Sequence, residues 1–179
     1  MKKVFYAAVL LGLVCAGGLL IAADSTPEQS TLTKQGQEAP VFTATTLDGR
    51  KFDLKGLRGK VVLINFFATW CGPCMEEMPH LEKDVWQKYK DKNFVMISIG
   101  REHSQAELAE FLKKHSFTFA LAPDPKREIY KQFATQYIPR NYVIDAEGKI
   151  AFQSMGYNAD EFAKMISLID REVAKTAKN

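Results

Sequence analysis

Cysteine is scarce in this chain of 179 residues, and only Cys71 and Cys74 follow the apolar N-terminal stretch that contains Cys15. Two cysteines cannot build a disulfide framework, and a chain of this length buries a core without one. A basic stripe with interleaved aromatic side chains is also missing, and the net charge is only +3 from 24 basic and 21 acidic residues. Nucleic-acid binding is therefore not expected.

Apolar runs long enough to span a membrane are absent after residue 23, but one occupies the start of the chain. Lys2 and Lys3 precede an apolar run over 4–23 that ends on small residues, as in a secretory signal peptide. Twenty such residues could also cross a bilayer core of ~30 Å, so an uncleaved N-terminal membrane anchor is the alternative. Gly17 and Gly18 weaken a spanning helix and favour cleavage. Both readings predict a periplasmic or otherwise extracytoplasmic protein, with or without a tether to the inner membrane.

Internal repeats and low-complexity tracts are lacking too, which predicts one domain. The polar stretch 24–39 is typical of a linker, and residues 40–176 are expected to form the domain. Within it, 42–47 and 51–54 flank Asp48-Gly49, a strong signal for a two-residue hairpin turn.

Strand-like and helix-like patterns alternate downstream, which predicts a mixed α/β sandwich with helices on both faces. Pro79 is expected to kink the first helix. The expected strands are 61–67, 94–99, 117–121, 141–145 and 150–153, and the expected helices are 72–90, one capped by Ser104, 124–134 and one opening at Asn158 or Asp160.

Cys71 and Cys74 lie where the expected strand 61–67 gives way to the expected helix 72–90. The unpaired N–H groups and positive dipole end of a helix N-terminus favour a thiolate over a thiol. Once Cys71 has formed a mixed disulfide, Cys74 can resolve it. A structural bridge is the competing interpretation, but one that closes so small a loop constrains little. The spacing therefore predicts thiol–disulfide exchange.

Two segments resemble the thioredoxin family. Residues 66–74, Phe-Phe-Ala-Thr-Trp-Cys-Gly-Pro-Cys, resemble its active-site segment, and 137–150 resemble the segment that carries its cis-proline. The N-terminal apolar run, the hairpin and an extra strand–helix unit within 94–122 are similar to the extracytoplasmic TlpA/ResA-type reductases, over about 36–175. The resemblance implies a thioredoxin fold, with a central mixed sheet flanked by helices, an N-terminal β-hairpin and an inserted strand–helix unit.

The resemblance also assigns roles to the residues of these segments. Cys71 would be the attacking thiol and Cys74 the resolving thiol, with the ring of Trp70 covering the pair. Pro139 would follow a cis peptide bond, which frees the backbone of Ile138 to pair with an extended substrate strand.

Glu77 is the candidate proton acceptor. Thioredoxin itself has a buried aspartate on the preceding strand, where this chain has Asn65, which cannot titrate. TlpA/ResA-type proteins resemble this chain at Glu77 instead, which lies three residues after Cys74 and so on the same side of a helix. Burial would raise the pKa of Glu77 and suit it to move protons near neutral pH. A solvated acid, as expected for Glu76, is the alternative.

The remaining polar candidates carry less information. His80, His103 and His115 are expected at the surface, and residues 101–103 are a candidate substrate-contact patch. Arg140 would place a cation near the substrate groove or simply be solvated. A zinc site lacks a second Cys-x-x-Cys or a paired histidine spacing, and no cofactor or metal is expected.

The leading hypothesis is a monomeric extracytoplasmic thiol-disulfide oxidoreductase that reduces protein disulfides. The resemblance implies a membrane thiol relay as electron donor and apocytochrome c thiols as one substrate class, and a general reductase of misoxidised proteins fits as well. A disulfide oxidase or isomerase and a non-enzymatic binding module remain alternatives. So does a peroxiredoxin-type peroxidase, although its Pro-x-x-x-Thr-x-x-Cys run is not matched, because Thr69 stands two residues before Cys71.

Overall fold

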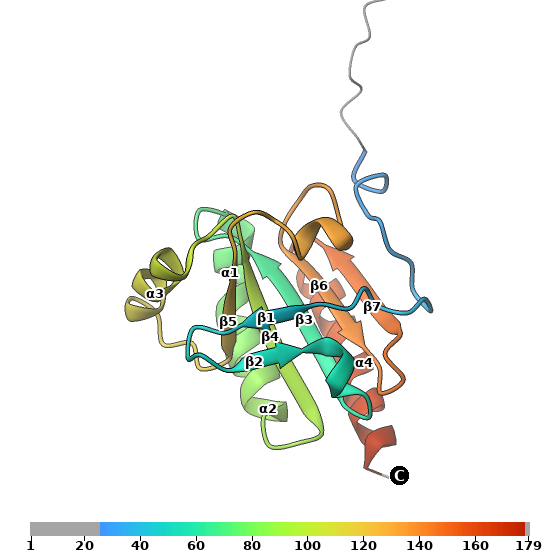
Figure 1. The fold of residues 1–179 in the computed structure, drawn as a ribbon. Coiled ribbons are helices and arrows are strands. Elements are labelled where there is room, and N and C mark those ends of the chain that lie inside the picture. Colours follow the sequence, from blue (N-terminus) through green and yellow to red (C-terminus); the bar gives the residue numbers. More distant parts are fainter. Residues whose placement is uncertain (1–25, 178–179) are drawn as a thin grey trace, which may run out of the picture.

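The structure is a computed structural model that describes residues 26–177 (Figure 1). The leader 1–23, with its expected signal or anchor, therefore lies outside the described residues. In chain order the elements are β1 (Thr43–Thr45), β2 (Lys51–Asp53), the 3-10 helix η1 (Leu54–Leu57), β3 (Val61–Phe67), α1 (Gly72–His80), the π-helix η2 (Leu81–Trp86), α2 (Gln87–Tyr89), β4 (Phe94–Arg101), α3 (Gln105–Lys113), β5 (Ala120–Asp124), the 3-10 helix η3 (Tyr130–Gln132), β6 (Arg140–Ile144), β7 (Ile150–Met155) and α4 (Ala159–Thr176).

A five-stranded mixed sheet in the order β5-β4-β3-β6-β7 forms the centre of the molecule. Strand β3 is buried along its whole length, as expected for an apolar strand covered on both faces. It pairs in parallel with β4 and antiparallel with β6, which places Asn65 opposite Asn141. The central mixed sheet, the hairpin and the inserted unit β4–α3–β5 confirm the predicted fold class.

The two faces of the sheet are covered differently. Side chains of α1, α3 and α4 form the core on one face. The hairpin β1–β2 and the segment 129–134 cover the other face, and Figure 1 shows the hairpin crossing in front of the sheet. The expected helix 124–134 is wrong, because only the short 3-10 helix η3 forms there. The carboxylate of Asp124 instead accepts hydrogen bonds from the backbone N–H groups of Ile129 and Tyr130, which holds the segment as a turn.

The helix that carries the cysteines is continuous but irregular. Residues 72–80 are α-helical. A π-helical stretch, Leu81–Trp86, begins two residues after Pro79, and α2 forms the end of this helical segment. The distortion fits the expected kink, because proline supplies no backbone N–H and crowds the preceding turn. The strand expected at 117–121 lies slightly later in the chain, at Ala120–Asp124.

The stretch expected as a linker lies along the domain from its described start at residue 26. The Leu32 backbone N–H donates to the Phe133 carbonyl oxygen, and the Thr135 N–H donates to that of Ser30. Further along, the Ala39 N–H donates to a carbonyl oxygen of the β6–β7 turn. Backbone groups that pair in this way order the segment despite its polar composition. Across residues 26–177, no helix is both long and apolar enough to cross a membrane.

Candidate active site

The two cysteines lie at the carboxyl end of β3 and the start of α1. Cys71 is the N-cap of α1 and forms a disulfide with Cys74, with 5.3 Å between their Cα atoms. The Cys74 backbone N–H lies 3.3 Å from Cys71 Sγ, so the helix N-terminus donates to this sulfur. After reduction the same N–H would stabilise a thiolate on Cys71. Pro73 lies in the first turn, where its missing N–H costs no hydrogen bond.

A cis peptide bond between Ile138 and Pro139 lies beside the disulfide, as the resemblance predicts. Cys71 Sγ is 3.7 Å from the carbonyl oxygen of Ile138, although 67 residues separate them in the chain. The residues directly before Cys71 and Ile138 in the chain carry exposed aromatic side chains, Trp70 at 63% and Tyr137 at 40%. The Cys71 sulfur therefore lies beside the backbone of the loop that carries the cis-proline, and Cys71 is 7% exposed.

The Arg101 side chain makes cation–π contacts with two aromatic rings, those of Trp70 and Tyr130. The Arg101 guanidinium lies 5.6 Å from the Trp70 ring centroid and 5.2 Å from that of Tyr130. The Tyr130 hydroxyl is 2.6 Å from the carbonyl oxygens of Gln136 and Tyr137, and it can donate its proton to either. Residue Arg101 of the expected contact patch thus links the Trp70 loop to the loop before the cis-proline.

Arg140 is a buried structural residue, and both expectations for it, a cation near the groove or a solvated charge, are wrong. Its residue is only 1% exposed. Its Nε donates to the carbonyl oxygens of Gln136 and Tyr137 at 3.1 Å, and its two terminal nitrogens donate to Thr31 Oγ1 at 2.8 Å and Ser30 Oγ at 2.5 Å. Arg140 therefore ties the N-terminal segment to the loop that carries the cis-proline.

Glu77 is buried beneath the disulfide, 1% exposed, which agrees with the burial expected for it. Asn65 Nδ2 donates to Glu77 Oε2 at 3.1 Å and Asn141 Nδ2 donates to Glu77 Oε1 at 2.5 Å. Burial raises the pKa of Glu77 to about 7, against the smaller opposing effect of these two hydrogen bonds. A carboxyl group that titrates there can both accept and release protons near neutral pH.

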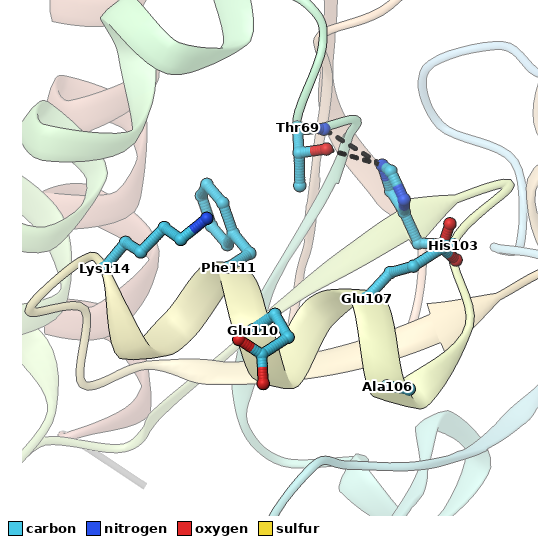
Figure 2. A pocket seen from close by; sticks show the side chains of 7 residues that line it. All are labelled: Thr69, His103, Ala106, Glu107, Glu110, Phe111 and Lys114. Atoms are coloured by element: carbon cyan, nitrogen blue, oxygen red, sulfur yellow. Dashed lines mark hydrogen bonds between the residues drawn. The ribbon is translucent and has the colours of Figure 1, made fainter.

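His103 is buried, 5% exposed, so the expectation of a surface histidine is wrong for this residue. Its Nε2 accepts a hydrogen bond from the Thr69 backbone N–H at 3.0 Å, which fixes the backbone two residues before Cys71. Burial holds the pKa of His103 below its ordinary value, and the neutral ring is the form that can accept this bond. Figure 2 shows both residues at the edge of a pocket of about 460 Å³, which is completed by α3 side chains: Ala106, Glu107, Glu110, Phe111 and Lys114.

Three parts of the site were not predicted from the sequence: Asn141, Tyr130 and the N-terminal residues around Ser30. Asn141 stands two residues after the predicted cis-proline, and that proximity was the only signal available for it. Within residues 26–177, no group of three or more His, Cys, Asp or Glu side chains is placed to hold a metal ion.

Comparison with known proteins agrees with this geometry. The model of the AhpC/TSA family matches residues 35–153. The chain belongs to the AhpC/TSA family. It is 32% identical over 165 residues to the thiol-disulfide oxidoreductase ResA of Bacillus thuringiensis subsp. konkukian, a match that covers 89% of this chain and 92% of the relative. It is also 37% identical over 119 residues to the thioredoxin-like protein YneN of Bacillus subtilis, covering 65% and 69%.

Solved structures show the same relationship. A Bacteroides thetaiotaomicron protein provisionally named a protein disulfide isomerase is 39% identical with a TM-score of 0.78, over 81% of this chain and 93% of that one. A Chlorobium tepidum protein, provisionally named the thiol:disulfide interchange protein DsbE, is 29% identical with a TM-score of 0.64, over 75% and 96%. This member of the family is thus a thioredoxin-like thiol-disulfide oxidoreductase of the ResA/DsbE type, and the resemblance inferred from residues 66–74 and 137–150 is confirmed.

Proposed function

We propose that this oxidoreductase reduces disulfides of protein substrates outside the cytoplasm. The observation that carries the proposal is the position of Cys71 Sγ, 3.7 Å from the Ile138 carbonyl oxygen, with exposed aromatic residues, Trp70 and Tyr137, directly before these two residues in the chain. An extended substrate pairs with the Ile138 backbone and so brings its disulfide to Cys71. A pocket for a small-molecule oxidant would instead need an enclosed site around one sulfur.

The reaction proceeds by two displacements at sulfur. The Cys71 thiolate attacks one sulfur of the substrate disulfide, forms a mixed disulfide and releases the other substrate sulfur as a thiolate. The Cys74 thiolate then attacks Cys71 Sγ, which releases the second substrate thiolate and leaves the Cys71–Cys74 disulfide. The substrate gains two electrons and the enzyme dithiol loses two.

Glu77 accepts the proton that Cys74 must lose before the second displacement. Cys74 is buried, 1% exposed, so solvent has little access to its thiol. Glu77 follows three residues later on α1, on the same side of the helix. Its pKa of about 7 leaves part of the population ionised at neutral pH and ready to take that proton.

Reduction is favoured over oxidation by the Cys-Gly-Pro-Cys sequence, which this chain shares with thioredoxin. A reductase outside the cytoplasm needs a supply of electrons, for which we propose a membrane thiol relay. Apocytochrome c thiols are one substrate class and other misoxidised proteins are a second. The apolar leader 4–23 supports export, as a cleaved signal or as a membrane anchor.

The reduction potential of the Cys71–Cys74 pair tests the direction. The protein is equilibrated with glutathione buffers of known potential, and the fraction of disulfide is read by thiol trapping. We expect a value near that of thioredoxin, about −270 mV, because the dipeptide between the cysteines is the same. A value near that of DsbA, about −120 mV, would reverse the assignment to an oxidase or isomerase.

A further inference from the structure

Asn65 and Asn141 form a closed ring of hydrogen bonds with Glu77. Besides its bond to Glu77, Asn65 Nδ2 lies 2.9 Å from Asn141 Oδ1. This contact turns the Asn141 amide so that its Nδ2 faces the second carboxylate oxygen of Glu77. All three side chains are buried. Each oxygen of the carboxylate therefore has its own amide donor.

The ring depends on the pairing of two distant strands. Asn65 on β3 and Asn141 on β6 are direct partners in the antiparallel register, so their side chains project from the same face at adjacent positions. That face carries α1, from which Glu77 points down to the sheet. A shift of register by one residue would turn Asn141 to the opposite face and open the ring.

We propose that Asn65 and Asn141 are positioning residues that hold Glu77 in the ionised form needed at neutral pH, an inference that rests on its proposed role as proton acceptor. Two neutral donors stabilise a buried carboxylate, whereas burial alone favours the protonated acid. A lysine or arginine at either position would go further and keep Glu77 permanently ionised, unable to hold a proton. A pair of amides leaves both protonation states accessible.

Few other ionisable groups of the described residues lie near Glu77, so its titration can be measured with little interference. The Cys71–Cys74 pair and the exposed Glu76 lie on α1, and Tyr157 lies between β7 and α4. Burial raises the pKa of Tyr157, and the charges of Glu76 and Glu77 add to that rise. The cysteines do not titrate while they form the disulfide, so in the oxidised protein they do not interfere with the titration of Glu77.

The experiment follows the carboxyl carbon of Glu77 by NMR in oxidised protein labelled with ¹³C-glutamate. Its signal is assigned by its loss in Glu77→Gln and by its persistence in Glu76→Gln. We expect Asn65→Leu and Asn141→Leu each to raise the titration midpoint by about one pH unit, since each removes a hydrogen bond to a charged group. Should a leucine variant not fold, Asn65→Ala or Asn141→Ala is expected to shift the midpoint in the same direction.

Ser98→Ala is the matched control. Ser98 is buried on β4 at the position paired with Asn65, and its hydroxyl makes no hydrogen bond to any described residue. We expect its midpoint to equal that of the wild type. Asparagine variants that melt earlier but titrate at the wild-type midpoint would overturn the proposal, as would a Ser98→Ala shift of the same size.

A kinetic measurement separates this inference from the proposed role of Glu77. The rate of insulin reduction is followed against pH in the wild type, in Glu77→Gln and in the asparagine variants. We expect the asparagine variants to move the part of the rise that depends on Glu77 to higher pH, and Glu77→Gln to remove that part and leave the rise due to ionisation of Cys71. An unchanged profile in Glu77→Gln would refute the proton-acceptor role, even if the NMR midpoints had shifted as expected.

Discussion

Glu77 illustrates how one side chain can serve chemistry at the expense of stability. Its carboxyl group is buried with no cation within hydrogen-bonding distance among the described residues, and only amides bind it. In the unfolded chain this group ionises at about pH 4.3, whereas in the folded protein its pKa is about 7. The native state therefore retains a proton that the unfolded state gives up.

The first prediction concerns the pH dependence of stability in Glu77→Gln. The contribution of the raised pKa is fully present below the unfolded pKa and is lost as the pH rises to about 7. Above that pH the ionised Glu77 costs up to about 4 kcal/mol. Glutamine carries no charge, so we expect the variant to gain stability over the wild type between pH 5 and pH 8, as measured by urea unfolding. The same difference at both pH values would contradict this, and Glu76→Gln, at an exposed site, serves as control.

At the scale of elements, the largest difference from expectation is the N-terminal segment, which is bound to the domain and not a separate linker. Residues 26–39 read as a linker by composition, yet Ser30 and Thr31 provide two of the acceptors for the buried guanidinium of Arg140. The same guanidinium binds the carbonyl oxygens before Pro139. The segment is thus one support of the loop that faces the disulfide.

Removing these acceptors is expected to weaken the whole domain. In Ser30→Ala/Thr31→Val a buried cation loses two hydrogen bonds, which should lower the free energy of unfolding by about 2–4 kcal/mol. Urea denaturation at pH 7 measures the change. Lys34→Ala, at an exposed position of the same segment, should change stability by less than about 0.5 kcal/mol. Equal losses in both variants would show that Arg140 does not depend on Ser30 and Thr31.

For the molecule as a whole, the sheet order decides which chemistry is available. Strands β3 and β6 are antiparallel neighbours. The turn after β3 and the loop before β6 therefore meet at the same end of the sheet. The disulfide lies there, with Cys71 Sγ 3.7 Å from the Ile138 carbonyl oxygen. The inserted helix α3 packs onto β4 at Gly100, where a Cβ would lie 2.7 Å from the Leu108 side chain.

This architecture predicts a poor peroxidase despite the AhpC/TSA family match. Cys71 and Cys74 form a disulfide across one helical turn. On reduction the site therefore contains a dithiol and not a single peroxide-reactive thiol. We expect the reduced protein to consume hydrogen peroxide no faster than a free dithiol, measured by peroxide loss with dithiothreitol as the reference. Consumption of hydrogen peroxide that saturates with peroxide concentration, is lost in Cys71→Ser and persists in Cys74→Ser would instead establish the peroxidase alternative.

Local patterns accounted for the features that depend on neighbouring residues. The apolar run 61–67, the Asp48-Gly49 turn and the Cys-x-x-Cys spacing each act within one element, so their residue types were sufficient to place them. The cis-proline was reached through family resemblance, because nothing local distinguishes Pro139 from an ordinary proline. The helix predicted over 124–134 does not form, because the carboxylate of Asp124 accepts hydrogen bonds from backbone N–H groups of the segment. The sequence pattern does not reveal this interaction.

The order of amino acids was enough to indicate a redox dithiol at the start of a helix, since strand, turn and helix signals are contiguous there. Folding in three dimensions settled which polar side chains surround it. Asn65 and Asn141 are 76 residues apart, and Arg140 reaches Ser30 across 110. Such pairs are set by strand register and by the packing of distant segments. The physical reason is that burial and hydrogen-bond partnership are properties of the assembled core.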